Sequence, residues 1–474
     1  MERKPRHFIQ ELKGTDAMEK SFIKALAGIV GEANTLTDPE SLACYGYDST
    51  PELQSRPGAV LLPGSAEEIS QVMALCHEAG VRVTPRGSGT NLSGGSISFD
   101  AGVVLQTSRL NRILEIDEEN LTATVETGVI TSALHREVEA KGLFYPPDPG
   151  SMNISTMGGN VAENSGGLRG LKYGVTDDYV MGLKTMLADG DLLKTGGKVV
   201  KDVAGYNLNQ LLVSSEGTLG VFTEITVKLI PKPVAKKTML VHFPQLEQAA
   251  LTVSHIIAAR IIPATLEFLD RVTIKCVEDY AHVGLPLDVD AVLLIEVDGH
   301  PAQVEEDAAG IRQICERHHC SFFQTAAGPE EALKLATARR VALSALARMR
   351  PTTILEDATV PRSCIAPMVK LIQDTARKYD LLIGTFGHAG DGNLHPTCLT
   401  DERNPDEIAR AHKAFGEIFE ATIAMGGTIT GEHGVGVAKK KYLPKLVGES
   451  GLRVMRGIKG ALDPKGILNP GKIF

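Results

Sequence analysis

The sequence contains no tryptophan, and only 5% of its residues are aromatic. A surface that binds single-stranded nucleic acid by stacking needs several aromatic side chains, so none is expected here. No block of basic residues stands out, and the formal net charge is -9 at pH 7. Because nucleic-acid binding depends on clustered positive charge, these absences argue against a nucleic acid as the partner.

Long apolar runs are also missing. No stretch approaches the roughly 18 apolar residues of a membrane-spanning helix, and residues 1–16 lack the apolar core of a signal peptide. The seven cysteines are scattered and odd in number, which suits a reducing compartment better than a disulfide framework. We therefore expect a cytoplasmic protein without a membrane span. A chain of 474 residues is long enough for two or three domains.

Glycine is abundant, and it is concentrated around two histidines. The segment FGHAGDGNLHP, residues 386–396, contains three glycines. Each glycine inside a helix costs about 1 kcal/mol relative to alanine, so this segment is expected to turn. Its flanks have the composition of strands, which predicts a hairpin with residues 389–392 at the tip.

Such a turn brings His388 and His395 close together. A third ligand would complete an open metal site of the catalytic type, and Glu432 in the sequence GEHG is the candidate. His433 would then be left unligated as a proton acceptor. The alternative is that the two histidines are unrelated. The setting favours the site, because functional groups are often carried on glycine-rich loops.

Two further glycine-rich stretches lie in the first half of the chain, at residues 85–95 and 146–167. The first follows an expected strand, and glycine lets backbone N–H groups approach an anion closely. It is not a dinucleotide-binding fingerprint, because Leu92 occupies the third glycine position and no helix is expected there. A structural turn is the alternative. The second stretch is predicted to be a long functional loop.

Helical spacing and strand-like runs alternate along the rest of the chain. Helices are expected at residues 17–30, 65–79, 131–141, 246–259, 303–318, 330–350 and 406–424. Residues 231–237 are interpreted as a linker. After it, two strand–helix–strand units predict a small antiparallel sheet with helices on one face. The segment from Cys315 to Cys320 is interpreted as structural rather than metal-binding.

Seven segments resemble, in the same order, those of FAD-linked 2-hydroxy-acid dehydrogenases, a family of vanillyl-alcohol-oxidase type that includes D-lactate dehydrogenase and the catalytic FAD subunit of glycolate oxidase. They read PRGSGTNLSGG, DPGSMNISTMGGNVAENSGG, KYGVTDDYV, VKDVAGYNLNQLLVSSEGTLGVFTEITVKL, GHAGDGNLHP, GEHGVG and DPKGILNPGKIF. The resemblance covers residues 40–474. It implies an α+β fold with a PCMH-type FAD-binding domain of two α+β subdomains and a ferredoxin-like cap.

The resemblance also implies a division of the chain. We expect an N-terminal helical arm at residues 1–35, the FAD-binding domain at 36–230 and the cap or substrate domain at 231–424. A C-terminal segment, residues 425–474, would return to the flavin domain with an active-site loop.

The same resemblance assigns residues to FAD. The pyrophosphate would be wrapped by Pro85, Arg86, Gly87, Ser88, Gly89, Thr90 and Asn91. The isoalloxazine and ribityl chain would be lined by Pro149, Ser151, Thr156, Gly158, Gly159, Asn160, Asn164, Gly166, Gly167, Tyr173 and Gly174. The adenosine end would be approached by Glu216, Gly217 and Ile225, and the flavin by Asn469. The first loop lacks the histidine through which many relatives attach the flavin, so we expect non-covalent FAD.

At the reacting centre, the resemblance implies that His388, His395 and Glu432 bind a divalent cation, Zn²⁺ by preference. His433 would be the general base. Asp391 and Asn393 would orient the ligands.

Arg339 matches the arginine that holds the substrate carboxylate in the family. The alternative is a solvated basic face shared with Arg340 and Arg348. Relatives that oxidise D-2-hydroxyglutarate carry a lysine where this chain has Leu355, which favours a small monocarboxylate.

The expected reaction is oxidation of D-lactate or glycolate to the 2-oxo acid, with hydride transfer to the flavin. Electrons would pass to a separate partner, an iron–sulfur subunit or an electron-transfer flavoprotein, because the chain has no cysteine run for an iron–sulfur cluster. The alternatives are a non-catalytic flavin-binding subunit, a D-2-hydroxyglutarate dehydrogenase and a zinc hydrolase without flavin.

Overall fold

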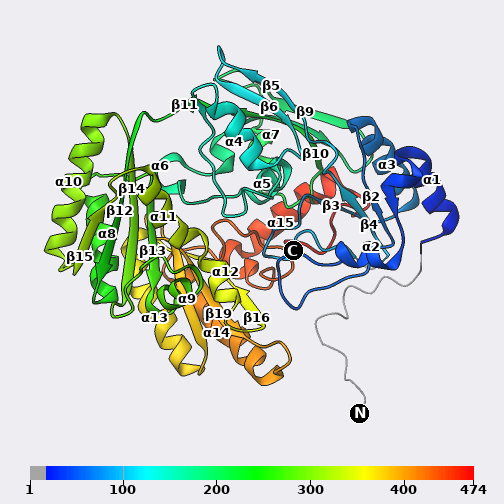
Figure 1. Ribbon diagram of the computed structural model, residues 1–474. Helices are drawn as coiled ribbons and strands as arrows, with labels where there is room; N and C mark the ends of the chain where they lie inside the picture. The colour runs from blue at the N-terminus through cyan, green and yellow to red at the C-terminus, as the bar shows by residue number, and fades with distance from the viewer. Residues whose placement is uncertain (1–17, 100) are drawn as a thin grey trace.

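The computed structural model describes residues 18–99 and 101–474. Figure 1 shows two lobes side by side: one carries the blue and cyan strands, and the other carries the green to orange sheet. Residues 1–17 of the expected N-terminal arm lie outside the described residues, whereas its helix is present as α1 (Lys20–Val30). Leu26 and Val30 bury the apolar face of α1 in the core of the first lobe.

The first sheet of this lobe has four strands in the order β1-β2-β4-β3. The strands are β1 (Thr35–Leu36), β2 (Ala59–Leu61), β3 (Val83–Arg86) and β4 (Val103–Gln106). The helices beside it are η1 (Glu32–Asn34), α2 (Pro39–Cys44) and α3 (Ala66–Ala79). The predicted helix at residues 65–79 is confirmed, because Ser65 caps it by accepting a hydrogen bond from the Glu68 N–H and Gly80 ends it in the left-handed region.

The second sheet has five antiparallel strands in the order β5-β6-β10-β8-β9. They are β5 (Ile113–Asp117), β6 (Thr122–Glu126), β8 (Val180–Met186), β9 (Leu192–Gly196) and β10 (Val221–Lys228). The helices that accompany it are α4 (Thr131–Glu139), α5 (Met157–Glu163), α6 (Gly170–Tyr173), η2 (Thr176–Asp178) and α7 (Leu208–Leu212). The short strands β7 (Leu143–Phe144) and β11 (Ile230–Pro231) form a separate antiparallel pair.

Helix α5 corrects the prediction of a continuous loop at residues 146–167. The Thr156 side chain accepts a hydrogen bond from the Gly159 N–H at the start of the helix, and Asn164 ends it in the left-handed conformation. Two interior glycines disfavour a helix by their propensity. Val161 and Met157 are completely buried in the core of the lobe, and this tertiary packing outweighs the propensity.

The second lobe contains an antiparallel sheet of eight strands. They are β12 (Ala235–Phe243), β13 (Thr265–Asp270), β14 (Ala291–Gly299), β15 (Phe322–Thr325), β16 (Thr352–Leu355), β17 (Ala358–Thr359), β18 (Leu382–His388) and β19 (Asn393–Thr400). The order is β15-β12-β14-β13-β18-β19-β16, and β17 pairs with β19. The two predicted strand–helix–strand units are present, but the histidine hairpin β18–β19 extends their sheet. Lys236 and Lys237 lie in β12, so their assignment to a linker was wrong.

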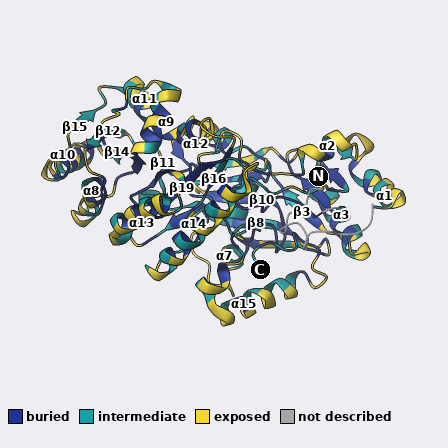
Figure 2. Cartoon of the chain, turned by 90° about the horizontal axis from the view of Figure 1, so that it is seen from below, coloured by how far each residue is buried: buried dark blue, intermediate teal, exposed yellow. Residues whose placement is uncertain are grey.

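Helices cover both faces of this sheet, which corrects the prediction of helices on one face. The larger core involves α8 (Leu246–Ala258), α10 (Pro301–Arg317), α13 (Ile365–Lys378) and α14 (Pro405–Ala424). The other involves α9 (Arg271–Ala281), α11 (Pro329–Arg340) and α12 (Ala342–Ala347). Successive side chains of a strand point to opposite faces of the sheet. In β14, Leu293 and Ile295 pack in the larger core on one face, and Val292 and Leu294 pack in the second core on the other face. In Figure 2 the strands are accordingly dark and the outer helix faces yellow.

The end of the chain returns to the first lobe, where Ile458 and Leu462 pack against the core, whereas Ile429 and Tyr442 of the same expected segment lie in the core of the second lobe. After η3 (Arg362–Cys364) and the second-lobe helices comes α15 (Leu443–Leu462), a helix that was not predicted from the sequence. Beyond α15, Leu468 pairs with Val83 of β3, and the Asn469 N–H donates to the Val83 carbonyl at 2.7 Å. No helix among residues 18–99 and 101–474 is both long and apolar enough to cross a membrane.

Candidate active site

The hairpin of β18 and β19 positions both histidines. His388 ends β18 opposite Asn393, and residues 389–392 form the turn, so the predicted hairpin is confirmed. Gly392 in this turn has a φ of +90°, which glycine adopts readily. A Cβ atom there would lie 2.1 Å from the Val360 carbonyl oxygen, so the turn requires glycine at this position.

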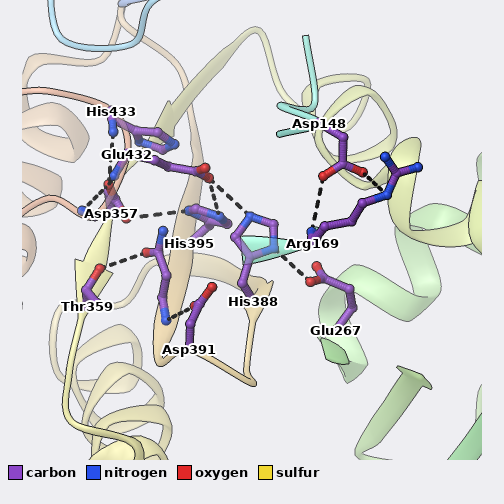
Figure 3. Close-up of polar contacts among 12 residues, drawn as sticks. Asp148, Arg169, Glu267, Asp357, Thr359, His388, Asp391, His395, Glu432 and His433 are labelled. Carbon is purple, nitrogen blue, oxygen red and sulfur yellow. Dashed lines mark hydrogen bonds and ion pairs between the residues drawn. The ribbon is translucent and has the colours of Figure 1, made fainter. Parts of the chain in front are cut away.

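Two histidine nitrogens face one carboxylate oxygen (Figure 3). The Nε2 atoms of His388 and His395 lie 3.2 and 3.3 Å from Oε1 of Glu432. One ligand atom from each of these residues lies within 4.8 Å of the others, an arrangement that can hold a metal ion. Burial alone lowers the pKa of His388, but the charges of Glu267 and Glu432 raise it well above its ordinary value. The structure thus brings the three proposed ligands together.

A second carboxylate faces the other nitrogen of each histidine. Nδ1 of His388 lies 2.7 Å from Oε1 of Glu267, and Nδ1 of His395 lies 3.8 Å from Oδ1 of Asp357. Metal-binding histidines commonly use one ring nitrogen for the metal and donate the other N–H to a carboxylate or carbonyl. Both Nε2 atoms are therefore directed towards the centre of the site. Neither Glu267 nor Asp357 was among the predicted site residues.

Asp357 also fixes the loop that carries Glu432 and His433. Its Oδ2 accepts hydrogen bonds from the Thr430 hydroxyl at 3.0 Å and from the backbone N–H groups of Gly431, Glu432 and His433 at 2.7, 2.9 and 3.1 Å. A carboxylate that accepts several N–H bonds is strongly held as the anion. Asp357 therefore holds residues 430–433, and Glu216 holds the next part of the loop by accepting from the Val435 and Gly436 N–H groups.

His433 lies against the metal-ligand cluster. Its ring stacks on His395 with centroids 5.1 Å apart and an interplanar angle of 12°. Its buried Nδ1 has no hydrogen-bond partner among the described residues. Burial is the main cause that lowers the pKa of His433 to about 4. The imidazole is therefore neutral near pH 7 and able to accept a proton.

Asp391 and Asn393 lie at the hairpin tip. The Asn393 N–H donates to Asp391 Oδ1 at 3.1 Å, and Asn393 Oδ1 accepts from the Thr359 hydroxyl at 3.1 Å. Their side chains thus stabilise the turn, and no hydrogen bond from either to a proposed ligand side chain is found among the described residues. Burial raises the pKa of Asp391 to about 6.

One cavity of about 480 Å³ connects this cluster with the glycine-rich loops of the first lobe. It is lined by all seven residues from Pro85 to Asn91 and by His388, His395, Glu432, His433 and Arg339. From the other predicted flavin residues it is lined by Pro149, Ser151, Thr156, Gly158, Gly159, Asn160, Glu216 and Gly217. The predicted flavin residues and the histidine cluster thus share one cavity. Direct transfer of a hydride from substrate to flavin requires the two molecules to be bound next to each other in this way.

Seven predicted flavin residues do not line this cavity: Asn164, Gly166, Gly167, Tyr173, Gly174, Ile225 and Asn469. Ile225 of β10 is completely buried in the core of the first lobe. Asn469 donates from its amide to the Gly95 and Glu216 carbonyls, so it supports the lining. The Tyr173 hydroxyl donates to Asp298 of the second lobe at 2.9 Å.

Arg339 is buried, with 8% of its surface exposed, which excludes the solvated basic face. Its Nε donates to Oε2 of Glu267, and its guanidinium carbon lies 4.7 Å from the centre of the Phe386 ring. Glu267 is completely buried, and its two oxygens therefore serve His388 and Arg339. A sequence signal existed for Glu267, because this charged residue lies between the apolar residues Leu266 and Phe268 of a predicted strand.

The backbone of Gly158 lies against the Thr127 side chain at the wall of this cavity. A Cβ atom there would lie 1.8 Å from the Thr127 hydroxyl, so the start of α5 would have to move. Overpacking costs about 1 to 3 kcal/mol, and we expect Gly158→Ala to weaken FAD binding about 10- to 100-fold. Titration of the apoprotein with FAD, followed by flavin fluorescence, measures this.

Gly28→Ala is the control for Gly158→Ala. Gly28 lies in α1 outside the cavity lining, and a Cβ atom there would meet nothing within 4 Å. FAD affinity is expected to stay unchanged in this variant. Equal affinities for both variants would contradict the role assigned to the close contact at Gly158.

Comparison with known proteins identifies the class. Family models match residues 57–196, as an FAD binding domain, and residues 232–473, as the C-terminal domain of FAD linked oxidases. A p-cresol methylhydroxylase structure has a TM-score of 0.79 at 18% identity and covers 96% of both chains. A 4-ethylphenol oxidase from Gulosibacter chungangensis has a TM-score of 0.78 at 18% identity, with the same coverage. These likenesses show the fold and confirm the predicted α+β, PCMH-type architecture. The protein is an FAD-dependent oxidoreductase.

Curated relatives narrow the class. Glycolate oxidase subunit GlcD of Bacillus subtilis is 60% identical over 430 residues, 91% of this chain and 92% of that protein. GlcD of Escherichia coli K12 is 37% identical, covering 96% and 91%. A D-lactate dehydrogenase of Anaerostipes hadrus is 34% identical, covering 92% and 91%. The chain therefore belongs to the FAD-linked oxidase family, and the resemblance seen in its sequence is confirmed.

Proposed function

We propose that the protein oxidises a small 2-hydroxy acid, glycolate or D-lactate, to the corresponding 2-oxo acid. The observation that carries this proposal is the shared cavity, which joins the glycine-rich loops to the His388, His395 and Glu432 cluster and to the neutral His433. The names of the relatives support this substrate class. The FAD-binding fold supplies the electron acceptor.

FAD would be held by the loop from Pro85 to Asn91 and by the residues around α5. The close contact between Gly158 and Thr127 supports this placement, because both residues line the cavity and a larger residue at 158 would displace this part of its wall. The first loop offers Thr90 and Asn91 but no histidine, which supports non-covalent binding. When bound, FAD supplies a hydride acceptor at its N5 atom.

A divalent cation, Zn²⁺ by preference, would be held by His388, His395 and Glu432. Two imidazoles and one carboxylate form a ligand set typical of catalytic zinc, and the carboxylates behind the imidazoles leave both Nε2 atoms directed inwards. When bound, such a cation supplies Lewis-acid stabilisation of an alkoxide.

The chain's own residues divide the remaining work. His433 would accept the proton of the substrate hydroxyl, since burial keeps its imidazole neutral. Arg339 would hold the substrate carboxylate with the two Nη groups that Glu267 does not engage. Leu355, at the position where relatives that oxidise D-2-hydroxyglutarate carry a lysine, lines the cavity beside Leu343 and Phe386, which supports a monocarboxylate. Arg340 lines the same cavity, so the comparison with D-2-hydroxyglutarate below tests this preference.

Electrons would then leave through a separate carrier, an iron–sulfur subunit or an electron-transfer flavoprotein. The two potential metal-binding groups found among the described residues contain no cysteine, which supports an acceptor on another chain. All seven cysteines are free, which supports a cytoplasmic location.

The proposal is tested by anaerobic bleaching of the flavin absorbance. Glycolate or D-lactate is expected to bleach the metal-replete protein rapidly, whereas L-lactate and D-2-hydroxyglutarate are expected to react at least about tenfold more slowly, the effect of about 1.4 kcal/mol in the transition state. A flavin spectrum that none of the four acids changes would contradict the proposed function and favour a non-catalytic flavin subunit.

A further inference from the structure

Glu267 is a charged side chain within an otherwise apolar part of β13, and both of its oxygens are engaged. Oε1 lies 2.7 Å from Nδ1 of His388, and Oε2 accepts a hydrogen bond from Nε of Arg339. The carboxylate is completely buried. Burying a charge is costly unless it is paired, and this one is paired with two groups of the site.

We propose that Glu267 is a positioning residue that orients a metal ligand and the substrate-binding arginine at the same time. This inference rests on the proposed function, in which His388 binds the cation and Arg339 binds the substrate carboxylate. Glu267 would touch neither molecule. It would act through the two side chains that do.

The first action of Glu267 is on the tautomer of His388. A carboxylate accepts hydrogen bonds and donates none, so the proton of a neutral His388 ring lies on Nδ1. The lone pair is then on Nε2, which faces Glu432 and the centre of the cluster. Without this acceptor the ring would be free to carry its proton on Nε2. A protonated Nε2 has no lone pair and cannot bind a metal.

The second action is on the guanidinium of Arg339. Glu267 engages the Nε edge, and the ring of Phe386 lies 4.7 Å from the guanidinium carbon. These two contacts restrict rotation of the planar group. Its two Nη groups remain available on the side of the cavity that Arg339 lines, where they match the two oxygens of a carboxylate.

Glutamine cannot replace Glu267 in both contacts. An amide has one accepting oxygen and one donating nitrogen, whereas His388 Nδ1 and Arg339 Nε both present hydrogens to this side chain. Whichever way the amide turns, one contact becomes donor against donor. The E267Q variant should therefore weaken metal binding, substrate binding or both, with almost no change in side-chain volume.

The test compares E267Q with D270N in the FAD-loaded protein. Asp270 lies on the same strand and is also buried, but it accepts from the Thr273 and Thr385 N–H groups and has no hydrogen bond to His388 or Arg339 among the described residues. Zn²⁺ affinity is measured by chelator competition without substrate. The KM for glycolate and the limiting rate of flavin reduction are measured separately.

For E267Q we expect Zn²⁺ affinity to fall about 10- to 100-fold, as is typical when a partner behind a metal ligand is removed, and KM to rise at saturating Zn²⁺. D270N should lower the unfolding temperature and leave both quantities within twofold of the wild type. Wild-type behaviour of E267Q in both measurements, or equal losses in both variants, would overturn the inference. A wild-type protein that binds Zn²⁺ but that no 2-hydroxy acid reduces would refute the proposed function, and the zinc comparison would still decide the role of Glu267.

Discussion

Replacement of His433 by alanine is expected to slow the reduction of bound FAD by glycolate or D-lactate about 10²- to 10⁴-fold, the usual contribution of a positioned general base. The physical reason is that the variant lacks the neutral imidazole that would take the hydroxyl proton. Because Asp357 holds the loop through backbone N–H groups, the alanine variant should keep the loop in place. Anaerobic stopped-flow spectroscopy measures the rate.

The control for His433→Ala is His412→Ala. His412 is exposed and lies 3.3 Å from Glu52, away from the cavity lining. Its flavin reduction rate should match that of the wild type, and both variants should retain their FAD and metal content. Normal rates in His433→Ala would show that the base has been assigned incorrectly, whereas partial recovery with added imidazole would support the assignment.

Loss of the proposed metal should slow the reduction of FAD by a factor similar to that expected for His433→Ala. Treatment with a chelator, or the substitution His395→Asn, is expected to lower the rate of flavin reduction about 10³-fold. This corresponds to about 4 kcal/mol of lost charge stabilisation in the transition state. The reason is that His395 contributes one of the two Nε2 atoms that face Glu432.

Two measurements distinguish metal loss from general damage. Metal analysis should find about one equivalent of divalent cation in the wild type and much less in His395→Asn, while both proteins retain FAD. Added Zn²⁺ should restore the chelated wild type but not the variant. Full activity in a protein shown to contain no divalent cation would exclude a catalytic metal.

The sequence predicted those parts of the site whose geometry is local. The glycines between the strands of the histidine hairpin required a turn, and the turn placed His388 near His395. Glu432 was recognised from its glycine-rich loop. Glu267, in contrast, reaches His388 from a strand far away in the sequence, and only the order of strands in the sheet makes them neighbours. No local pattern contains that information.

The errors in the fold have a similar origin. Helix α5 contains two glycines and follows a polar loop, so its local propensity is low, and its buried side chains decide the outcome. Lys236 and Lys237 were predicted to lie in a linker because of their charge and the nearby prolines. In the structure they form the start of β12, where pairing with β14 outweighs composition.

The pairing of Leu468 with Val83 affects how the nascent chain can fold during synthesis. Strand β3 lies at the edge of its sheet, and the segment around Leu468 covers that edge. At a synthesis rate of about 5 to 20 residues per second, β3 would wait about 20 to 80 s for its covering segment. Uncovered strand edges promote association between chains. The first lobe is thus most exposed to aggregation while the second is being translated, and chaperones would be needed most during that interval.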